Sequence, residues 1–241
     1  IMVTRHRRNF DQDHEGTDIT FGTLTGYPCC FSNMHQGWPK FTQHLWYATP
    51  DNGIAAFTYS PSEVTAKVGN NVSVVISEDT YYPMDNRISF TIKEVKNKTK
   101  QVEFPLHLRI PKWCKRAEII VNGKAEQYIE GGRIAVINRI WKRNDNVELH
   151  LPMEVSTSIW YENAVTIERG PLVYALKIKE NWKKENLNNS WYSPHYYQVT
   201  SSEPWNYGLV DFDRSQVNKI AQVSIDSQKQ QSIFPWNQEN A

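Results

Sequence analysis

The chain has 241 residues, and its 27 lysines and arginines nearly balance 26 aspartates and glutamates, so its net charge is +1 with neutral histidines. A nucleic-acid-binding protein normally carries a basic excess gathered into a patch, so we expect no nucleic-acid partner. No stretch approaches the roughly 18 consecutive apolar residues of a membrane span, so we expect no membrane partner either. The first residues, Ile1–Asn9, lack the apolar core of a signal peptide. We therefore expect a soluble protein of one or two domains without its targeting segment.

The composition favours β structure. Nine tryptophans, 12 tyrosines and 9 phenylalanines make up 12% of the chain, and 12 prolines and 11 glycines supply frequent turns. The three cysteines are odd in number and two of them are adjacent, so a disulfide framework is not expected. The cysteines are better interpreted as thiols or as metal ligands.

The first candidate site in chain order is the pair Cys29-Cys30, which follows Gly26-Tyr27-Pro28 and precedes a predicted helix. Backbone N–H groups at a helix N-terminus favour the thiolate and lower a thiol pKa. Two thiolates on one loop can bind one metal ion, and zinc suits such ligands. The alternative is that both side chains are small buried apolar groups, as free cysteines commonly are.

A helix is predicted over Asn33–Tyr47, because four apolar residues there follow the period of one helix face. They are Met34, Trp38, Phe41 and Leu45. Pro39 must kink this helix or occupy the first turn of a later one. The position of Trp38 on the apolar stripe favours a core residue, whereas a substrate-binding interpretation has His35 bonding a sugar hydroxyl and Trp38 stacking on a sugar ring.

From residue 54 onward, short β-prone runs alternate with turn signals. Strands are predicted at Ile54–Tyr59, Val72–Ser77, Arg87–Lys93, Val102–Ile110, Ala117–Val121, Arg133–Ile137 and Asn146–Leu151. Arg87–Lys93 alternates strictly between apolar and polar residues, as a half-buried strand does. Asn122-Gly123 predicts a type I′ hairpin, and Gly131-Gly132 predicts the next reversal. This rhythm is typical of an antiparallel β-sandwich in a mainly β chain.

Several blocks of the sequence resemble a known family. The stretch Gly22–Thr49 (GTLTGYPCCFSNMHQGWPKFTQHLWYAT) is similar to the cysteine-pair motif of glycoside hydrolase family 127, the β-L-arabinofuranosidase-like enzymes. Further blocks follow in family order at Asp51–Ile54, Tyr59–Val64, Arg109–Trp113, Val121–Lys124, Arg169–Ala175 and Pro204–Tyr207. The resemblance therefore extends over nearly the whole chain, and it outweighs the interpretation of the cysteine pair as buried apolar groups.

The resemblance implies a retaining glycoside hydrolase. In that family the first cysteine of the pair is the nucleophile and a zinc ligand, which carries over to Cys29, and the second is a zinc ligand, which carries over to Cys30. The remaining ligands, a glutamate and a cysteine, and the glutamate acid/base lie in an upstream (α/α)₆ barrel. The helix after the pair would then be left from that missing barrel. The chain is expected to be the later part of a longer bacterial enzyme, inactive alone, whose substrate is an oligosaccharide or other glycoside.

Three parts are expected. Residues 1–50 would hold the end of the catalytic barrel with the cysteine loop and helix, residues 51–180 the β-sandwich, and residues 181–241 an extended, loop-rich part. Within the last part, the polar run Lys183–Ser190 is predicted to be a surface loop. The resemblance also suggests export, to the periplasm for example, with a cytoplasmic location as the alternative. The oligomeric state is left open.

Other residues and functions remain to be weighed. His14, Glu15 and Asp18 could line a sugar site or lie on a solvated loop. Cys114 is far along the chain from the pair and is interpreted as a free structural thiol. The competing function is a non-catalytic carbohydrate-binding or structural β-sandwich whose aromatic side chains stack on sugar rings.

Overall fold

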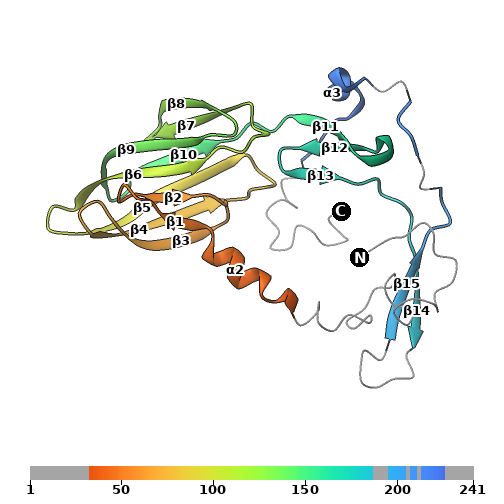
Figure 1. Ribbon diagram of the computed structural model, residues 1–241, viewed down its shortest axis with the longest axis horizontal. Coiled ribbons are helices and arrows are strands. Elements are labelled where there is room, and N and C mark those ends of the chain that lie inside the picture. The colour runs from red at the N-terminus through yellow and green to blue at the C-terminus, as the bar shows by residue number, and fades with distance from the viewer. Residues whose placement is uncertain (1–32, 187–194, 205–206, 211–212, 226–241) are drawn as a thin grey trace. The chain divides into compact units, whose positions relative to one another are not determined.

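The computed structural model describes residues 33–186, 195–204, 207–210 and 213–225 (Figure 1). It divides into two compact units, one formed by Ile1–Thr42 with Leu176–Asp211 and the other by Gln43–Ala175 with Phe212–Ala241. In both units strands predominate among the described residues, so the mainly β prediction is confirmed.

Ten strands of the larger unit form a sandwich of two sheets. The first sheet has the order β1-β2-β6-β9. Its strands are β1 (Trp46–Ala48), β2 (Ile54–Ala56), β6 (Gln101–Arg109) and β9 (Ile134–Lys142). The second sheet has the order β3-β4-β5-β10-β7-β8. Its strands are β3 (Ser62–Val68), β4 (Val72–Thr80), β5 (Arg87–Lys96), β10 (Asn146–His150), β7 (Arg116–Val121) and β8 (Lys124–Glu130).

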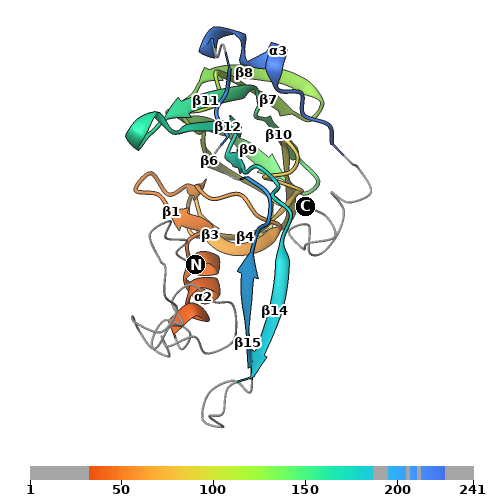
Figure 2. The same ribbon diagram turned by 90° about the vertical axis from the view of Figure 1, so that its right-hand side faces the viewer.

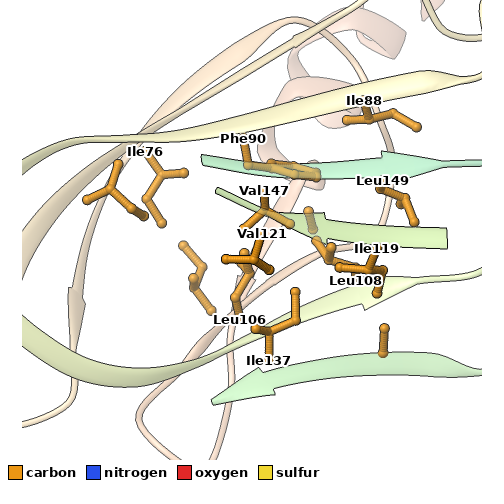
Figure 3. Packing of buried hydrophobic residues seen from close by; sticks show 14 of the residues in the cluster. Ile76, Ile88, Phe90, Leu106, Leu108, Ile119, Val121, Ile137, Val147 and Leu149 are labelled. Atoms are coloured by element: carbon orange, nitrogen blue, oxygen red, sulfur yellow. The ribbon is translucent and has the colours of Figure 1, made fainter. Parts of the chain in front are cut away.

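The core lies between the two sheets. Figure 3 shows apolar side chains of the six-stranded sheet, among them Phe90 and Val147, together with Leu106 and Ile137 of the four-stranded sheet. Trp141 is the largest fully buried side chain, and its indole Nε1 donates a 2.8 Å hydrogen bond to the Phe104 carbonyl. Because that polar atom is paired, burying the ring costs no unsatisfied donor.

The predicted antiparallel sandwich is confirmed, with one parallel pair within it. Strands β2 and β6 pair in parallel, with Ile54 opposite Leu106. They are far apart in sequence, with three strands of the other sheet between them, so no tight hairpin constrains their direction. The predicted turn at Asn122-Gly123 joins β7 to β8, and both residues have positive φ, 50° and 79°.

The predicted helix over Asn33–Tyr47 is wrong in its extent. Helix α2 covers Gly37–Gln43, with Pro39 in its first turn, and the chain then forms strand β1. Trp46 belongs to the sandwich, because its ring lies edge-on to Phe90 at 5.7 Å and its Nε1 donates to Ser62 Oγ at 3.0 Å. Tertiary packing therefore overrides the helical spacing at the end of the segment. Neither this helix nor any other in the described ranges is long and apolar enough to cross a membrane.

A smaller three-stranded sheet follows the sandwich within the same unit. It has the order β11-β12-β13, from Val155–Ile159, Val165–Arg169 and Leu172–Tyr174. The short 3₁₀ segment η2 (Tyr161–Asn163) lies in the β11–β12 hairpin, and a second, η3 (Arg214–Gln216), precedes helix α3 (Val217–Ile220), which contacts β11. Val217 of α3 is buried.

The smaller unit contains one described hairpin. Strands β14 (Asn181–Asn186) and β15 (His195–Thr200) pair antiparallel (Figure 2). The predicted surface loop Lys183–Ser190 is therefore wrong over residues 183–186, which lie in β14. These residues are polar, but pairing along a ribbon satisfies the backbone groups whatever the side chains are.

Candidate functional site

The cysteine pair Cys29-Cys30 lies outside the described residues, as do His14, Glu15 and Asp18. The residues that follow the pair are described from Asn33 onward. Their roles in catalysis and zinc binding therefore stay predictions, and the described structure supplies the environment of the two other candidates, His35 and Trp38.

His35 and Trp38 are both accessible on the segment after the pair. His35 lies in the turn before α2, and the Trp38 side chain is 75% exposed. Trp38 meets Phe41 edge-to-face, with the ring centroids 6.0 Å apart. Met34 is also exposed, so among the described residues the apolar stripe has Leu45 as its one buried member. The expectation that Trp38 is a core residue is not met within the described structure, and the ring is available for contacts.

Cys114 is the third cysteine, and its expected structural role is confirmed. It is a free thiol, fully buried in the sandwich core. Burial raises its pKa, because a thiolate is poorly stabilised among apolar groups. A buried thiol with a raised pKa is poorly suited to act as a nucleophile or a metal ligand. Among the residues that the structure describes, no three histidine, cysteine, aspartate or glutamate side chains gather as a metal site would require.

A buried carboxyl group at one end of the sandwich was not predicted from the sequence. Glu78 in β4 occupies a core-facing position and is only 3% exposed. It accepts hydrogen bonds from the Ser60 backbone N–H at 2.9 Å and from Ser62 Oγ at 3.4 Å. Burial raises the pKa of Glu78 to about 8, and the two hydrogen bonds act in the opposite direction.

Two tyrosines and an arginine belong to the same cluster. Tyr59 is buried, donates its hydroxyl to the Arg109 carbonyl at 2.6 Å and lies edge-on to Tyr82 at 5.9 Å. Burial raises the pKa of Tyr59 well above its usual range, and the Arg109 guanidinium opposes this shift. A raised carboxyl pKa suits a general acid, but a general acid must reach its substrate. Glu78 is enclosed, so it holds the loop at residues 60–62 and does no chemistry on a ligand.

The signal for Glu78 was present in the sequence. The alternation that places Val74 and Ile76 in the core continues to Glu78 and Thr80, which lie one and three positions beyond the predicted end of that strand. A charged residue on the apolar face of a strand indicates a buried polar contact. Because the predicted strand ended at Ser77, Glu78 was not recognised as a buried residue of that strand.

Two hollows lie on the described surface. One, of about 570 Å³, is lined mainly by polar residues of the larger unit, including Asp51, Asn97 and Asn138. Near it, His107 Nε2 lies 2.9 Å from Asp51 Oδ2, and the pKa of Asp51 is lowered, first by a hydrogen bond from Thr49. The other, of about 340 Å³, is lined mainly by apolar groups of the smaller unit. The second hollow includes the exposed ring of Tyr207 and the carboxyl group of Glu203, whereas the one aromatic residue of the first, Phe104, is buried.

Comparison with known proteins finds a family model that matches part of the chain and several solved structures of similar fold. Residues 53–153 match the GH127 middle domain of β-L-arabinofuranosidase. A search of curated proteins gave no match. Among solved structures, the chain is similar to Ara127N-Se, a GH127 β-L-arabinofuranosidase from Geobacillus stearothermophilus T6, with 22% identity and a TM-score of 0.58. That match covers 78% of this chain and 37% of the other.

Two further solved structures are also similar to this chain. A protein described as a glycoside hydrolase is 26% identical with a TM-score of 0.56, over 77% of this chain and 35% of its own. The GH127 β-arabinofuranosidase BT3674 is 20% identical with a TM-score of 0.53, over 73% of this chain and 32% of its own. The chain thus spans about a third of the length of these proteins. The resemblance to glycoside hydrolase family 127 is confirmed, with the family's middle domain over residues 53–153.

Proposed function

We propose that this chain is part of a retaining glycoside hydrolase that acts on β-L-arabinofuranosides or related glycosides. The observation that carries the proposal is the match of residues 53–153 to the GH127 middle domain. It is supported by the position of Cys29-Cys30, which precedes this domain in the sequence as the family's cysteine pair does.

In this proposal Cys29 is the nucleophile. Its sulfur bonds to the anomeric carbon as the glycosidic C–O bond breaks, and a glutamate elsewhere in the parent protein protonates the departing oxygen. The same glutamate then takes a proton from water, which displaces sulfur and releases the sugar with its configuration retained. Cysteine replaces the carboxylate that most retaining glycosidases use.

Cys29 and Cys30 would together hold a zinc ion, for which two thiolates are suitable donors. A bound zinc ion would keep the Cys29 sulfur ionised at neutral pH. A structural zinc site takes four ligands, and Cys114 cannot contribute one because it is buried in the sandwich core. The remaining ligands must therefore come from outside the described residues, which agrees with a site shared with the rest of a longer enzyme.

The described sandwich is then a support for the catalytic part. Its interior is apolar apart from a few buried polar side chains, and its raised-pKa carboxyl, Glu78, is enclosed. We accordingly expect this chain alone to hydrolyse no glycoside.

Cysteine variants of the full-length parent test the proposal. Cys29→Ser should abolish turnover of an aryl β-L-arabinofuranoside, because a serine hydroxyl is a far weaker acid and a poorer zinc ligand than a thiol. Cys30→Ser should lower zinc content first and turnover with it. Turnover by steady-state assay and zinc by elemental analysis separate these effects.

Cys114→Ala is the matched control, since it removes a thiol that the proposal does not use. It should keep turnover and zinc content near wild type. Wild-type turnover in Cys29→Ser would overturn the nucleophile assignment. Unchanged zinc content in both pair variants would favour the competing function, a carbohydrate-binding or structural module.

A further inference from the structure

The β11–β12 hairpin presents two aromatic residues at its tip. Trp160 is 64% exposed and Tyr161 is 85% exposed. The loop between the strands is closed by hydrogen bonds from the Trp160 N–H to the Ala164 carbonyl at 2.8 Å and from the Ala164 N–H to the Tyr161 carbonyl at 3.1 Å. The backbone that carries Trp160 is therefore fixed by its own pairing, as Figure 1 shows for strands β11 and β12.

The indole ring of Trp160 is also tethered. Its Nε1 donates a 2.8 Å hydrogen bond to Ser158 Oγ, two residues back on the same face of β11. An exposed indole would ordinarily use this N–H to bind water. Here the donor is already satisfied within the hairpin, so the ring is held in place and offers an apolar surface to a ligand.

A row of polar groups lies beside the ring. Ser158 and Thr166 are directly opposite each other across the hairpin, and Glu168 follows on the same face. Glu168 Oε1 accepts hydrogen bonds from Ser158 Oγ and from Thr166 Oγ1, the latter at 2.8 Å. These bonds lower the pKa of Glu168, so the group is a carboxylate at neutral pH.

The Glu168 carboxylate can accept further hydrogen bonds. Both of its hydrogen bonds to described residues use Oε1, which leaves Oε2 available to a ligand. The same small surface thus combines an oriented aromatic ring, a fixed carboxylate and the hydroxyls of Ser158 and Thr166.

This combination fits a sugar. One face of a sugar ring is made of C–H groups that pack on an aromatic ring, while its hydroxyls donate to carboxylates. A phosphate-bearing ligand would be repelled by Glu168, and a protein hot spot would surround the tryptophan with apolar groups that exclude water. Beside its exposed chain neighbours Ile159 and Tyr161, Trp160 has a hydrogen-bonded row of serine, threonine and glutamate next to it rather than a closed apolar ring.

We propose that the tip of the β11–β12 hairpin is a carbohydrate-binding site, in which Trp160 stacks on a sugar ring and Glu168 accepts hydrogen bonds from its hydroxyls. The ligand class rests on the proposed function; the site rests on the hairpin itself. It is separate from the chemistry assigned to Cys29 and would hold part of a glycan without cleaving it.

The test is sugar titration of the full 241-residue chain, followed by the NMR signal of the Trp160 indole N–H. Trp160→Phe identifies that signal by its absence. The probes are methyl β-L-arabinofuranoside, arabino-oligosaccharides and xylo-oligosaccharides. At least one of them should shift the Trp160 signal with saturable, millimolar affinity.

Variants then assign the contacts. Trp160→Ala should weaken sugar binding about tenfold or more, and Glu168→Gln should weaken it about threefold to tenfold. Ser158→Ala keeps the indole but removes its tether, and should also weaken binding several-fold. The matched control is Thr157→Ala, a substitution on the opposite face of β11 that should leave affinity unchanged.

Trp182→Ala is a second control, because Trp182 is an exposed indole that donates to Glu180 at 2.7 Å but lies in the other unit. No shift with any probe would overturn the proposal. Equal losses in Trp160→Ala and Trp182→Ala would also overturn it, since the binding would then be unspecific stacking. In the parent enzyme, Cys29→Ser should remove turnover and leave this binding intact, so failure of the hairpin site and failure of the proposed function give different results.

Discussion

At the scale of single residues, Glu78 gives the sandwich a pH-dependent stability. Its pKa is about 8 in the folded chain, against an ordinary value of 4.5. Between pH 4.5 and about pH 8, Glu78 is protonated in the folded state and ionised in the unfolded state. Stability should therefore be highest below about pH 4.5, as far as this group is concerned, and fall as the pH rises through 8.

We expect the free energy of unfolding to decrease by up to about 1.4 kcal/mol per pH unit within this window because of Glu78. Glu78→Gln should flatten that dependence, because the amide cannot ionise yet can still accept the Ser60 N–H. Urea unfolding at several pH values checks this. Glu63→Gln is the matched control, since Glu63 is exposed on the neighbouring strand β3 and its replacement should leave the slope unchanged. An unaltered slope in Glu78→Gln would contradict the assignment.

At the scale of elements, two glycines of the β7–β8–β9 region are required for different reasons. Gly123 has φ of 79° in the hairpin turn, and a Cβ there would meet no atom within 4 Å. A Cβ on Gly131 would instead lie 2.2 Å from the Cys114 carbonyl oxygen and 2.7 Å from that of Pro111. The first glycine is needed for its conformation and the second for its lack of a side chain.

Alanine substitutions should separate these causes. Gly123→Ala should lower the free energy of unfolding by about 1 kcal/mol, the cost of positive φ for an alanine. Gly131→Ala should cost about 3 kcal/mol or more, because rigid backbone must move away from the new methyl group. Chemical denaturation of both variants gives the comparison, and equal losses would show that the contact at Gly131 is relieved cheaply.

The predictable and unpredictable elements differ in physical character. The interior strands β5 and β10 were predicted well, because burial imposes regular alternation on them. Strands β3 and β8 were not among the predicted strands; they are the two edges of the six-stranded sheet, and their side chains are largely polar or exposed. The helix was predicted too long because Leu45 matches its period, yet Leu45 lies beyond the helix and its carbonyl accepts a hydrogen bond from the Phe57 N–H, next to β2. Cys29 and Cys30 were noticed in the sequence as an adjacent pair before a predicted helix, but the roles predicted for them came from family resemblance, since spacing alone does not distinguish zinc ligands from buried thiols.

At the scale of the whole molecule, the described residues form a scaffold, and the reacting groups of the proposed enzyme lie outside that scaffold. The core of the larger unit is one cluster of buried, almost wholly apolar residues that includes Trp141 and Phe90. A sandwich of this kind can fold without metal, because burial of apolar surface supplies its stability. Zinc binding should therefore be uncoupled from the folding of this chain.

The independence of folding from zinc binding leads to a prediction about zinc affinity. The 241-residue chain should bind zinc several orders of magnitude more weakly than the full-length parent, because Cys29 and Cys30 provide two of the four ligands that zinc requires. Chelator treatment should leave the thermal unfolding midpoint of the chain unchanged and lower the zinc content and turnover of the parent. Competition with a chromophoric chelator measures the affinities, and the chain with both Cys29→Ser and Cys30→Ser gives the background. Tight, stoichiometric zinc in the chain alone would mean that its own residues complete the site, and the proposal of a shared site would then fail.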